Sequence, residues 1–219
     1  MTETSAAVIA DIVGSRQLKD RARAQQLILE TFAAVAESAP PCVPAWATVG
    51  DEFQLVHRTW PEALRATLLI QLSLEAGVEL RFGIGLGEHR TVPGATAEDA
   101  HVFDGSAWYR AREAVIQAAQ RTGAATSFVG ADVQLSSAIE AALVLRDHVV
   151  GRLKARERRV ARGLLSGNTQ TEIATQERIT QSAVSQTVHR AGIDALLRVD
   201  AALQDLASRP SALRTRRAA

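Results

Sequence analysis

Residues 6–16 read Ala-Ala-Val-Ile-Ala-Asp-Ile-Val-Gly-Ser-Arg. The apolar run, closed by Gly14, is typical of a strand that is buried on both faces. One acidic residue, Asp11, interrupts it, and burying a carboxylate is costly unless the group is ion-paired or coordinates a cation. The stretch therefore predicts a central strand that carries either a cation ligand or a structural acid paired with Arg16 or Arg81.

The segments on the C-terminal side of this strand alternate between helical and strand patterns. Apolar residues recur at helical spacing over residues 17–37, 60–76 and 105–122. Strand patterns cover residues 44–49, 53–57 and 78–87, and a hairpin turn joins the first two. The order β-α-β-β-α-β predicts an α+β fold of the ferredoxin-like, palm type, in which helices cover one face of an antiparallel sheet.

Two acids on the predicted hairpin suggest a metal site. In this strand order the first strand and the hairpin Gly50-Asp51-Glu52-Phe53 can lie side by side, which brings Asp11 and Asp51 together. Mg²⁺ prefers one or two carboxylates together with phosphate oxygens. We therefore expect Asp11, Asp51 and Glu52 to hold Mg²⁺.

A phosphate-binding turn is expected next to this metal site. Gly14 and Ser15 end the first strand and can present backbone N–H groups to a phosphate, while Arg16 adds positive charge. Farther along the chain, Trp108 and Tyr109 either stack on a base or pack beneath a helix. The predicted nucleotide- or phosphate-binding residues are Gly14, Ser15, Arg16, Asp104 and Arg112.

The acidic pair resembles the metal site of the nucleotide cyclase and GGDEF superfamily, although Val49 stands where that signature has a second glycine. Four ordered blocks between residues 6 and 120 look like the SatD family of bacterial proteins. The blocks are Ala10-Asp-Ile-Val-Gly-Ser-Arg16, Gly50-Asp-Glu-Phe-Gln54, Leu80-Arg-Phe-Gly-Ile-Gly-Leu-Gly87 and Asp104-Gly-Ser-Ala-Trp-Tyr-Arg-Ala-Arg-Glu113. This resemblance implies that one site contains Asp11, Ser15, Arg16, Asp51, Glu52 and the block 104–113.

Residues 170–192 predict two short helices joined by a tight turn. The stretch resembles the helix-turn-helix of LuxR-type regulators and of sigma factors, with Arg178 at the turn position usually held by glycine. Short amide and hydroxyl side chains on the second helix are suited to hydrogen bonds with base edges in a major groove. The alternative is a helical hairpin that only packs. The predicted DNA-binding residues are Thr180, Gln181, Ser182, Ser185, Gln186, His189 and Arg190.

Charge is distributed unevenly along the chain, although the formal net charge is only +1. Residues 1–145 carry a net charge of −6, and residues 146–219 carry +7. A basic segment after an acidic one is typical of a DNA-binding module attached to a sensor or an enzyme. We therefore predict a palm-like, nucleotide-binding domain over residues 1–145 and a small all-α helix-turn-helix domain over residues 146–219.

These features together predict a DNA-binding transcriptional regulator whose palm senses or processes a nucleotide. The alternative is a Mg²⁺-dependent nucleotidyl cyclase- or transferase-like enzyme that its basic tail holds on nucleic acid. A scaffold without a ligand is a third interpretation. The expected partners are double-stranded DNA, a nucleotide and a second copy of the chain. The expected dimer contacts are the helical stretch over residues 139–150 and the apolar stripe over residues 193–206. The alternative is that this stripe folds back on the helix over residues 154–165 and completes a monomeric unit. A single cysteine, Cys42, and the lack of a membrane-length apolar run favour a cytoplasmic protein without a membrane partner.

Overall fold

The computed structural model describes residues 3–48, 51–75, 77–91 and 103–208. The strands are β1 (Glu3–Ile12), β2 (Val43–Ala47), β3 (Glu52–His57), β4 (Leu80–Thr91), β5 (Phe103–Asp104) and β6 (Thr126–Val129). The helices are α1 (Arg21–Ala36), α2 (Trp60–Ser73), α3 (Ser106–Ala119), α4 (Val133–Arg152), α5 (Ala155–Leu165), α6 (Gln170–Glu177), α7 (Gln181–Arg190) and α8 (Ile193–Ser208). A short 3₁₀ turn, η1 (Ser15–Gln17), follows β1.

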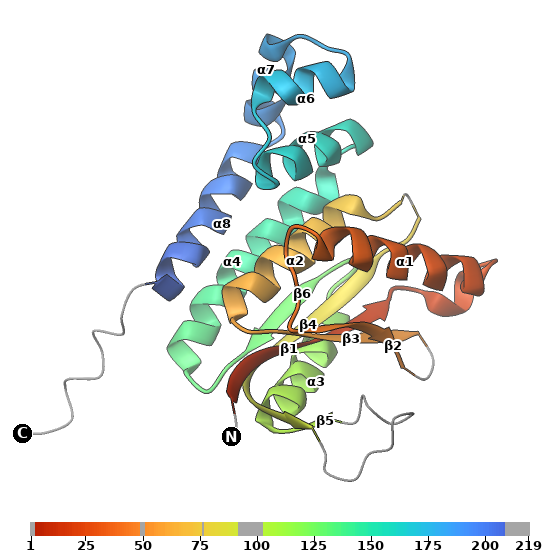
Figure 1. Ribbon diagram of the computed structural model, residues 1–219, viewed down its shortest axis with the longest axis vertical. Coiled ribbons are helices and arrows are strands. Elements are labelled where there is room, and N and C mark those ends of the chain that lie inside the picture. The colour runs from red at the N-terminus through yellow and green to blue at the C-terminus, as the bar shows by residue number, and fades with distance from the viewer. Residues whose placement is uncertain (1–2, 49–50, 76, 92–102, 209–219) are drawn as a thin grey trace, which may run out of the picture.

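The sheet confirms the predicted α+β class and strand order (Figure 1). Its strands lie in the order β2-β3-β1-β4-β5, and each of these neighbouring pairs is antiparallel. This is the arrangement that a β-α-β-β-α-β palm requires, with the first strand between the third and the fourth. Strand β6 was not predicted, and it pairs with β4 in parallel, so the sheet is mixed.

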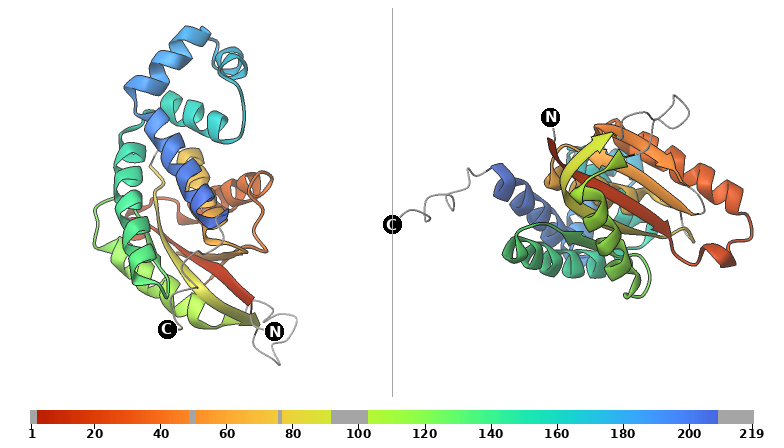
Figure 2. Two further views of the ribbon diagram at one scale, coloured as in Figure 1. Left: turned by 90° about the vertical axis from the view of Figure 1, so that its left-hand side faces the viewer. Right: turned by 90° about the horizontal axis from the view of Figure 1, so that it is seen from below.

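Helices cover both faces of the sheet, which corrects the expectation that one face would be left open. Alternate β1 residues such as Val8 and Ala10 belong to the core shared with α1 and α2, whereas Ala7 and Ile9 pack against α3. Figure 2 shows α3 on the opposite side of the sheet from α2 and α4. The continuous apolar run of β1 therefore reflects burial on both faces, as its sequence predicts.

Three glycines of β4 let α3 lie directly on the sheet. A Cβ atom added at Gly83 would lie 2.2 Å from the backbone nitrogen of Val115, and one at Gly85 would lie 2.1 Å from the carbonyl oxygen of Ala107. At Gly87 the added atom would meet Ser106 Oγ at 2.4 Å. The facing positions of α3 are alanines that are fully buried, namely Ala107, Ala111, Ala114 and Ala118.

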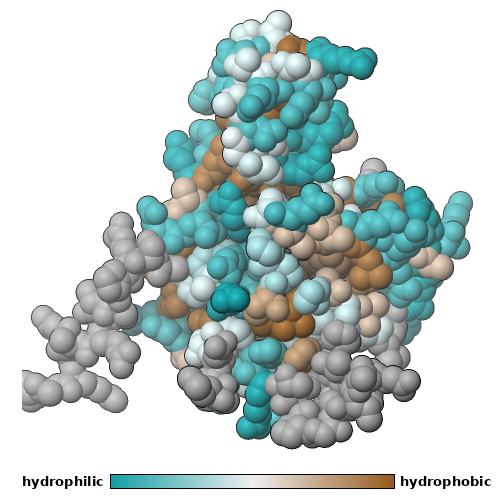
Figure 3. Space-filling model, in the orientation of Figure 1, coloured by the Kyte–Doolittle hydropathy of each residue, from teal (hydrophilic) through white to brown (hydrophobic). Residues whose placement is uncertain are grey.

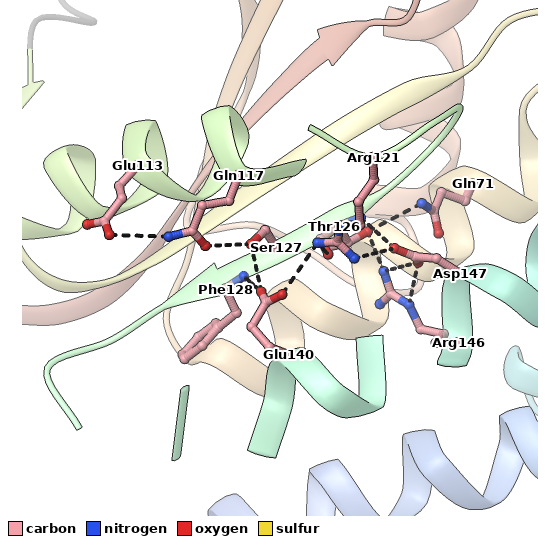
Figure 4. Close-up of polar contacts among 10 residues, drawn as sticks. All are labelled: Gln71, Glu113, Gln117, Arg121, Thr126, Ser127, Phe128, Glu140, Arg146 and Asp147. Atoms are coloured by element: carbon pink, nitrogen blue, oxygen red, sulfur yellow. Dashed lines mark hydrogen bonds and ion pairs between the residues drawn. The ribbon is translucent and has the colours of Figure 1, made fainter. Parts of the chain in front are cut away.

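Helix α4 covers the free edge of β6. Two of its carboxylates, seven residues apart and therefore on one helix face, accept backbone N–H groups of the strand. Glu140 binds the N–H of Phe128, and Asp147 binds the N–H of Thr126 (Figure 4). Arg146, which is 4% exposed, lies 3.1 Å from the Asp147 carboxylate and also donates to Leu64 O. The acids replace the neighbouring strand that an edge strand lacks.

Of the last four helices, α5 packs on α2, and α8 packs on both α2 and α4, whereas α6 and α7 pack on each other, on α5 and, through α7, on α8. Arg65 of α2 forms an ion pair of 2.6 Å with Asp200 of α8, and Gln204 of α8 donates to the carbonyl oxygen of Pro61. Arg158 of α5 donates to the carbonyl oxygen of Gln71 at 2.9 Å. The predicted boundary between residues 145 and 146 lies within the continuous helix α4, and the division into two domains stays a prediction.

The apolar stripe of α8 is used mainly within the chain. Ile193 and Leu196 are buried, and Leu197 and Leu203 pack against the same core, whereas Leu206 is 46% exposed. Within the described residues, no helix is both long and apolar enough to cross a bilayer.

We predict that Gly85→Ala lowers the free energy of unfolding by about 3 kcal/mol, because the new methyl group must push α3 away from the sheet. Gly151→Ala is the matched control. Position 151 is an exposed helical position of α4, and a Cβ atom added there would meet nothing within 4 Å. The change is therefore expected to stabilise the chain by up to about 1 kcal/mol. Urea unfolding followed by circular dichroism measures both, and equal effects would contradict the close packing of α3 on β4.

We also predict a loss of stability below pH 6.5 that arises at His57. Burial lowers the pKa of His57 from 6.5 to about 4, so between these values the unfolded chain binds a proton that the folded chain does not. The neutral His57 ring therefore makes its full contribution to the free energy of unfolding above pH 6.5. This contribution falls by about 3 kcal/mol in total as the pH drops toward 4. Urea unfolding of wild type and His57→Phe at several pH values measures the difference, in which carboxylate titrations common to both proteins cancel. A difference that does not change with pH would contradict this assignment.

Candidate functional site

Three charged side chains form a row across the sheet at the end of β1. Asp11 pairs in register with Glu52 on β3 and with Arg81 on β4, so all three point toward the α3 side. The Asp11 carboxylate lies 3.7 Å from Arg81 Nη1. Of the two arginines considered as partners of Asp11, Arg81 and not Arg16 forms the ion pair.

The hairpin brings a third carboxylate to the same end of β1. The carbonyl oxygen of Asp51 accepts the backbone N–H of Ile12 at 3.3 Å, which fixes the turn beside the strand end. The Asp51 carboxylate lies 4.0 Å from Arg21 Nη2, at the first residue of α1. The predicted approach of Asp11 and Asp51 is reflected in their direct electrostatic interaction.

Arg112 of α3 reaches across to Glu52. Its two terminal nitrogens donate to the two carboxylate oxygens, with Nη2 to Oε1 at 2.9 Å, and Gln54 Nε2 donates to Oε1 at 2.8 Å. Such a fork is the strongest geometry for a guanidinium–carboxylate pair. Glu52 therefore holds Arg112 through both of its carboxylate oxygens, and the metal set of Asp11, Asp51 and Glu52 stays a prediction.

The environment of Asp11 favours its neutral form. Burial raises the pKa of Asp11, and the like charge of Asp51 raises it further, against the lowering effect of Arg81. Glu52 and Arg112 act more weakly and in opposite directions. The like charge of Asp51 therefore raises the pKa of Asp11 by more than the positive charge of Arg81 lowers it.

The predicted phosphate-binding turn lies directly after the acidic row. Gly14 adopts a left-handed conformation (φ 65°) and leads into the 3₁₀ turn Ser15–Gln17, with Arg16 exposed. The backbone N–H of Gln17 donates to the Gly14 carbonyl oxygen at 2.8 Å. This N–H group is therefore bonded within the turn and is not directed at a ligand. Gly14, Ser15 and Arg16 thus stay within a few residues of Asp11 along the chain.

Asp104 is not brought to this site, contrary to the expectation of one common site. It pairs with Arg90 across β4 and β5, with a carboxylate–guanidinium distance of 2.7 Å, and it accepts the hydroxyl of Tyr109. The ion pair with Arg90 and its other hydrogen bonds lower the pKa of Asp104. Because Arg90 is nine residues along β4 from Arg81, the two ends are roughly 30 Å apart along the strand.

Of the two aromatic side chains in the block 104–113, Trp108 packs against other rings and Tyr109 is exposed. Trp108 stacks on Phe103 at a centroid distance of 5.8 Å and meets Trp46 of β2 edge-on at 5.9 Å. Tyr109 is 71% exposed and holds Asp104 through its hydroxyl. Sequence reasoning gave no role to Arg21, which belongs to none of the quoted blocks, or to Gln54, which ends the block 50–54. Only the fold places their side chains beside the acids.

The residues predicted to read DNA lie on and next to α7. Thr180 caps the helix by accepting the N–H of Ala183 at 3.2 Å, and Gln181 Nε2 donates to Gln170 of α6 at 2.7 Å. Arg178 takes the left-handed conformation (φ 55°) in the turn between α6 and α7. Ser185 is half-buried, and the remaining predicted residues are exposed, namely Ser182, Gln186, His189 and Arg190.

Comparison with known proteins gives a match to one family over most of the chain. A family model described as the SatD family matches residues 5–207. The crystal structure of the adenylyl cyclase CyaB from P. aeruginosa is a structural match with 15% sequence identity and a TM-score of 0.32, covering 65% of this chain and 73% of that chain. The comparison with curated proteins gives no match.

The predicted DNA-binding transcriptional regulator is wrong. The family match runs through α5–α8, so these helices belong to the same family unit as the palm and are not an appended reading module. The packing of α5 on α2 and of α8 on α2 and α4 agrees with this, and several of the basic side chains have partners within the chain. Arg156 and Arg159 pair with Glu177, and Arg158 binds a carbonyl oxygen of α2. Nothing in these comparisons supports the LuxR- or sigma-factor-like helix-turn-helix domain, and the hairpin that only packs is the interpretation that remains.

We predict that the pKa of Asp11 moves in opposite directions in two variants. Arg81→Met removes the neighbouring positive charge and should raise it, whereas Asp51→Asn removes the like charge and should lower it. Titration of the ¹³C-labelled carboxyl groups by NMR measures both, with Glu88→Gln on the distant part of β4 as the control that should change nothing. Shifts of the same sign in the two variants would contradict the placement of these groups around Asp11.

Proposed function

The chain belongs to the SatD family, and we propose that it binds a nucleotide with Mg²⁺ and acts as a nucleotidyl cyclase- or transferase-like enzyme. The observation that carries this proposal is the pair Asp11 and Asp51. Both carboxylates lie near the end of β1, the like charge of Asp51 raises the pKa of Asp11, and the guanidinium groups of Arg21 and Arg81 lie beside them. A divalent cation relieves the repulsion between the carboxylates, and the guanidinium groups are suited to phosphate oxygens.

The donor set fits Mg²⁺ bound together with a ligand. Among the residues that the structure describes, no three His, Cys, Asp or Glu side chains are grouped so as to enclose a metal ion by themselves. Mg²⁺ rarely uses such cages and instead combines one or two carboxylates with phosphate oxygens and water. Asp11 and Asp51 would hold the ion, because Glu52 is occupied by Arg112.

The arginines supply the complementary charge for a polyphosphate. The side chains of Arg21 and Arg112 are about half exposed, at 49% and 50%, and both start from helices that border the acidic row. Arg81 is more buried and balances Asp11 from the neighbouring strand. Glu52, which itself accepts a hydrogen bond from Gln54, holds Arg112 in place, so the guanidinium group is oriented before a ligand arrives.

The chemistry follows from which groups are present. In the proposed reaction the carboxylates hold the cation, the guanidinium groups bind phosphate oxygens, and a hydroxyl group of a substrate is the nucleophile. That oxygen forms a bond to the α-phosphorus of a nucleoside triphosphate, the bond to the bridging oxygen breaks, pyrophosphate leaves, and the hydroxyl proton passes to solvent. Bound Mg²⁺ supplies charge neutralisation on the phosphates. The arginines stabilise the negative charge on the leaving group.

We predict that isothermal titration calorimetry detects binding of ATP or GTP in the presence of Mg²⁺ and that EDTA abolishes it. Asp11→Asn should weaken this binding at least tenfold, because it removes one of the two charged cation ligands. Glu88→Gln, an exposed acid on the distant part of β4, is the control and should bind like wild type.

Two further results bear on the proposal. Release of pyrophosphate from the bound nucleotide, with a cyclic or transferred nucleotide identified by mass spectrometry, would support the enzymatic part. Nucleotide binding that survives in Asp11→Asn while the melting temperature rises would show that Asp11 is only a buried acid and would contradict the proposal.

The homodimer remains a prediction. Most of the α8 stripe is buried within the chain, and Val144 and Leu145 of α4 together with Leu206 of α8 are the exposed apolar side chains on which a dimer would depend. Light scattering at micromolar concentration, on wild type and on Leu145→Asp, is the corresponding measurement.

A further inference from the structure

A second concave site lies on the opposite face of the sheet from the acidic row. It is a cavity of about 400 Å³ between α1, α2 and the strands β2 and β3. Phe32 and Ala36 of α1 and Ile70 of α2 line its walls, and Pro40 and Pro44 lie at its rim. Figure 3 shows hydrophobic side chains at the surface in the region of α1 and α2. The volume lies within the range of small-molecule sites.

One polar side chain lines this otherwise apolar cavity. His57, the last residue of β3, points to the α1 side like Phe53 and Leu55, and it is 1% exposed. Neither Nδ1 nor Nε2 has a hydrogen-bond partner among the described residues. Every other residue that lines the cavity is apolar. Buried polar groups without partners are rare in folded proteins, because each costs the free energy of its lost hydration.

The ring is neutral near pH 7, because burial lowers the pKa of His57 to about 4. A neutral imidazole offers one N–H donor and one nitrogen acceptor. A hydroxyl group can satisfy either of these, whereas a charged ligand would lose its hydration in a cavity with no opposite charge.

From this geometry we propose that the cavity binds a small, neutral, mainly apolar molecule that carries one hydroxyl group and that His57 is its hydrogen-bond partner. The apolar lining supplies most of the binding free energy, and His57 selects for the hydroxyl. The site is independent of the proposed nucleotide site, because β3 directs Glu52 and Gln54 to one face of the sheet and Leu55 and His57 to the other.

The test compares two probes of the same shape, 1-naphthol and 1-methylnaphthalene. On wild type, 1-naphthol should bind about tenfold more tightly, because only its hydroxyl group can pair with His57. Its binding should also shift the ¹⁵N resonances of the His57 ring in NMR spectra. In His57→Phe the two probes should bind with nearly equal affinity, because the ring is retained and its nitrogens are lost.

A variant at the cavity wall keeps the proposal testable if His57→Phe does not fold. Ala33 is an exposed residue of α1 that lines the cavity, so Ala33→Phe should block both probes. Ala22→Phe, an exposed α1 position away from the cavity, should leave binding unchanged. The proposal is overturned if neither probe binds to wild type, if both bind equally well there, or if Ala33→Phe binds them like wild type.

Discussion

The contact between α3 and β4 is the constraint on which the α3 face of the sheet depends. Side chains on a strand normally keep a covering helix at a distance, but Gly83, Gly85 and Gly87 leave room for the helix backbone itself. The facing alanines of α3 complete this close approach. With α3 held so near the sheet, Arg112 can reach Glu52 at the start of β3. The three glycines of β4 thus affect the candidate site by setting the position of α3.

The edge of the sheet at β6 depends on carboxylates of α4 rather than on small residues. Strand β6 is short and pairs only with β4 in the described sheet, so its outer N–H groups need another partner. Glu140 and Asp147 of α4 supply it, and Arg121 and Arg146 balance their charge (Figure 4). Through α4, this edge also supports α8, which packs on α2. The C-terminal helices are therefore continuous with the palm in packing as well as in family membership.

Strand β3 gives the protein two chemically different faces. Its even-numbered residues Glu52 and Gln54 join the charged row beneath α3, and its odd-numbered residues Leu55 and His57 face the apolar cavity near α1. The two-residue period of a strand is enough to place the proposed polyphosphate site and the proposed apolar site on opposite faces of the sheet within six residues.

Local patterns in the sequence determined the elements of the palm and their order. The apolar run before Gly14, the hairpin acids and the alternation before Gly87 each depend on neighbours along the chain, so they could be interpreted without the fold. The approach of Asp11 to Asp51 followed from strand order alone. Strand β6 was not predicted, because a four-residue strand has too little periodicity to distinguish it from a loop.

Only the tertiary structure decided which charges meet. The fork between Arg112 and Glu52 joins residues sixty positions apart, and Asp104 is carried away from Asp11 by the length of β4. The basic C-terminal segment gave a misleading signal for the same reason, since net charge does not reveal that Arg158 and Arg159 bind partners within the chain. Periodicity is a local property that the amino-acid order contains directly, whereas the pairing of distant charges depends on how strands and helices pack in three dimensions.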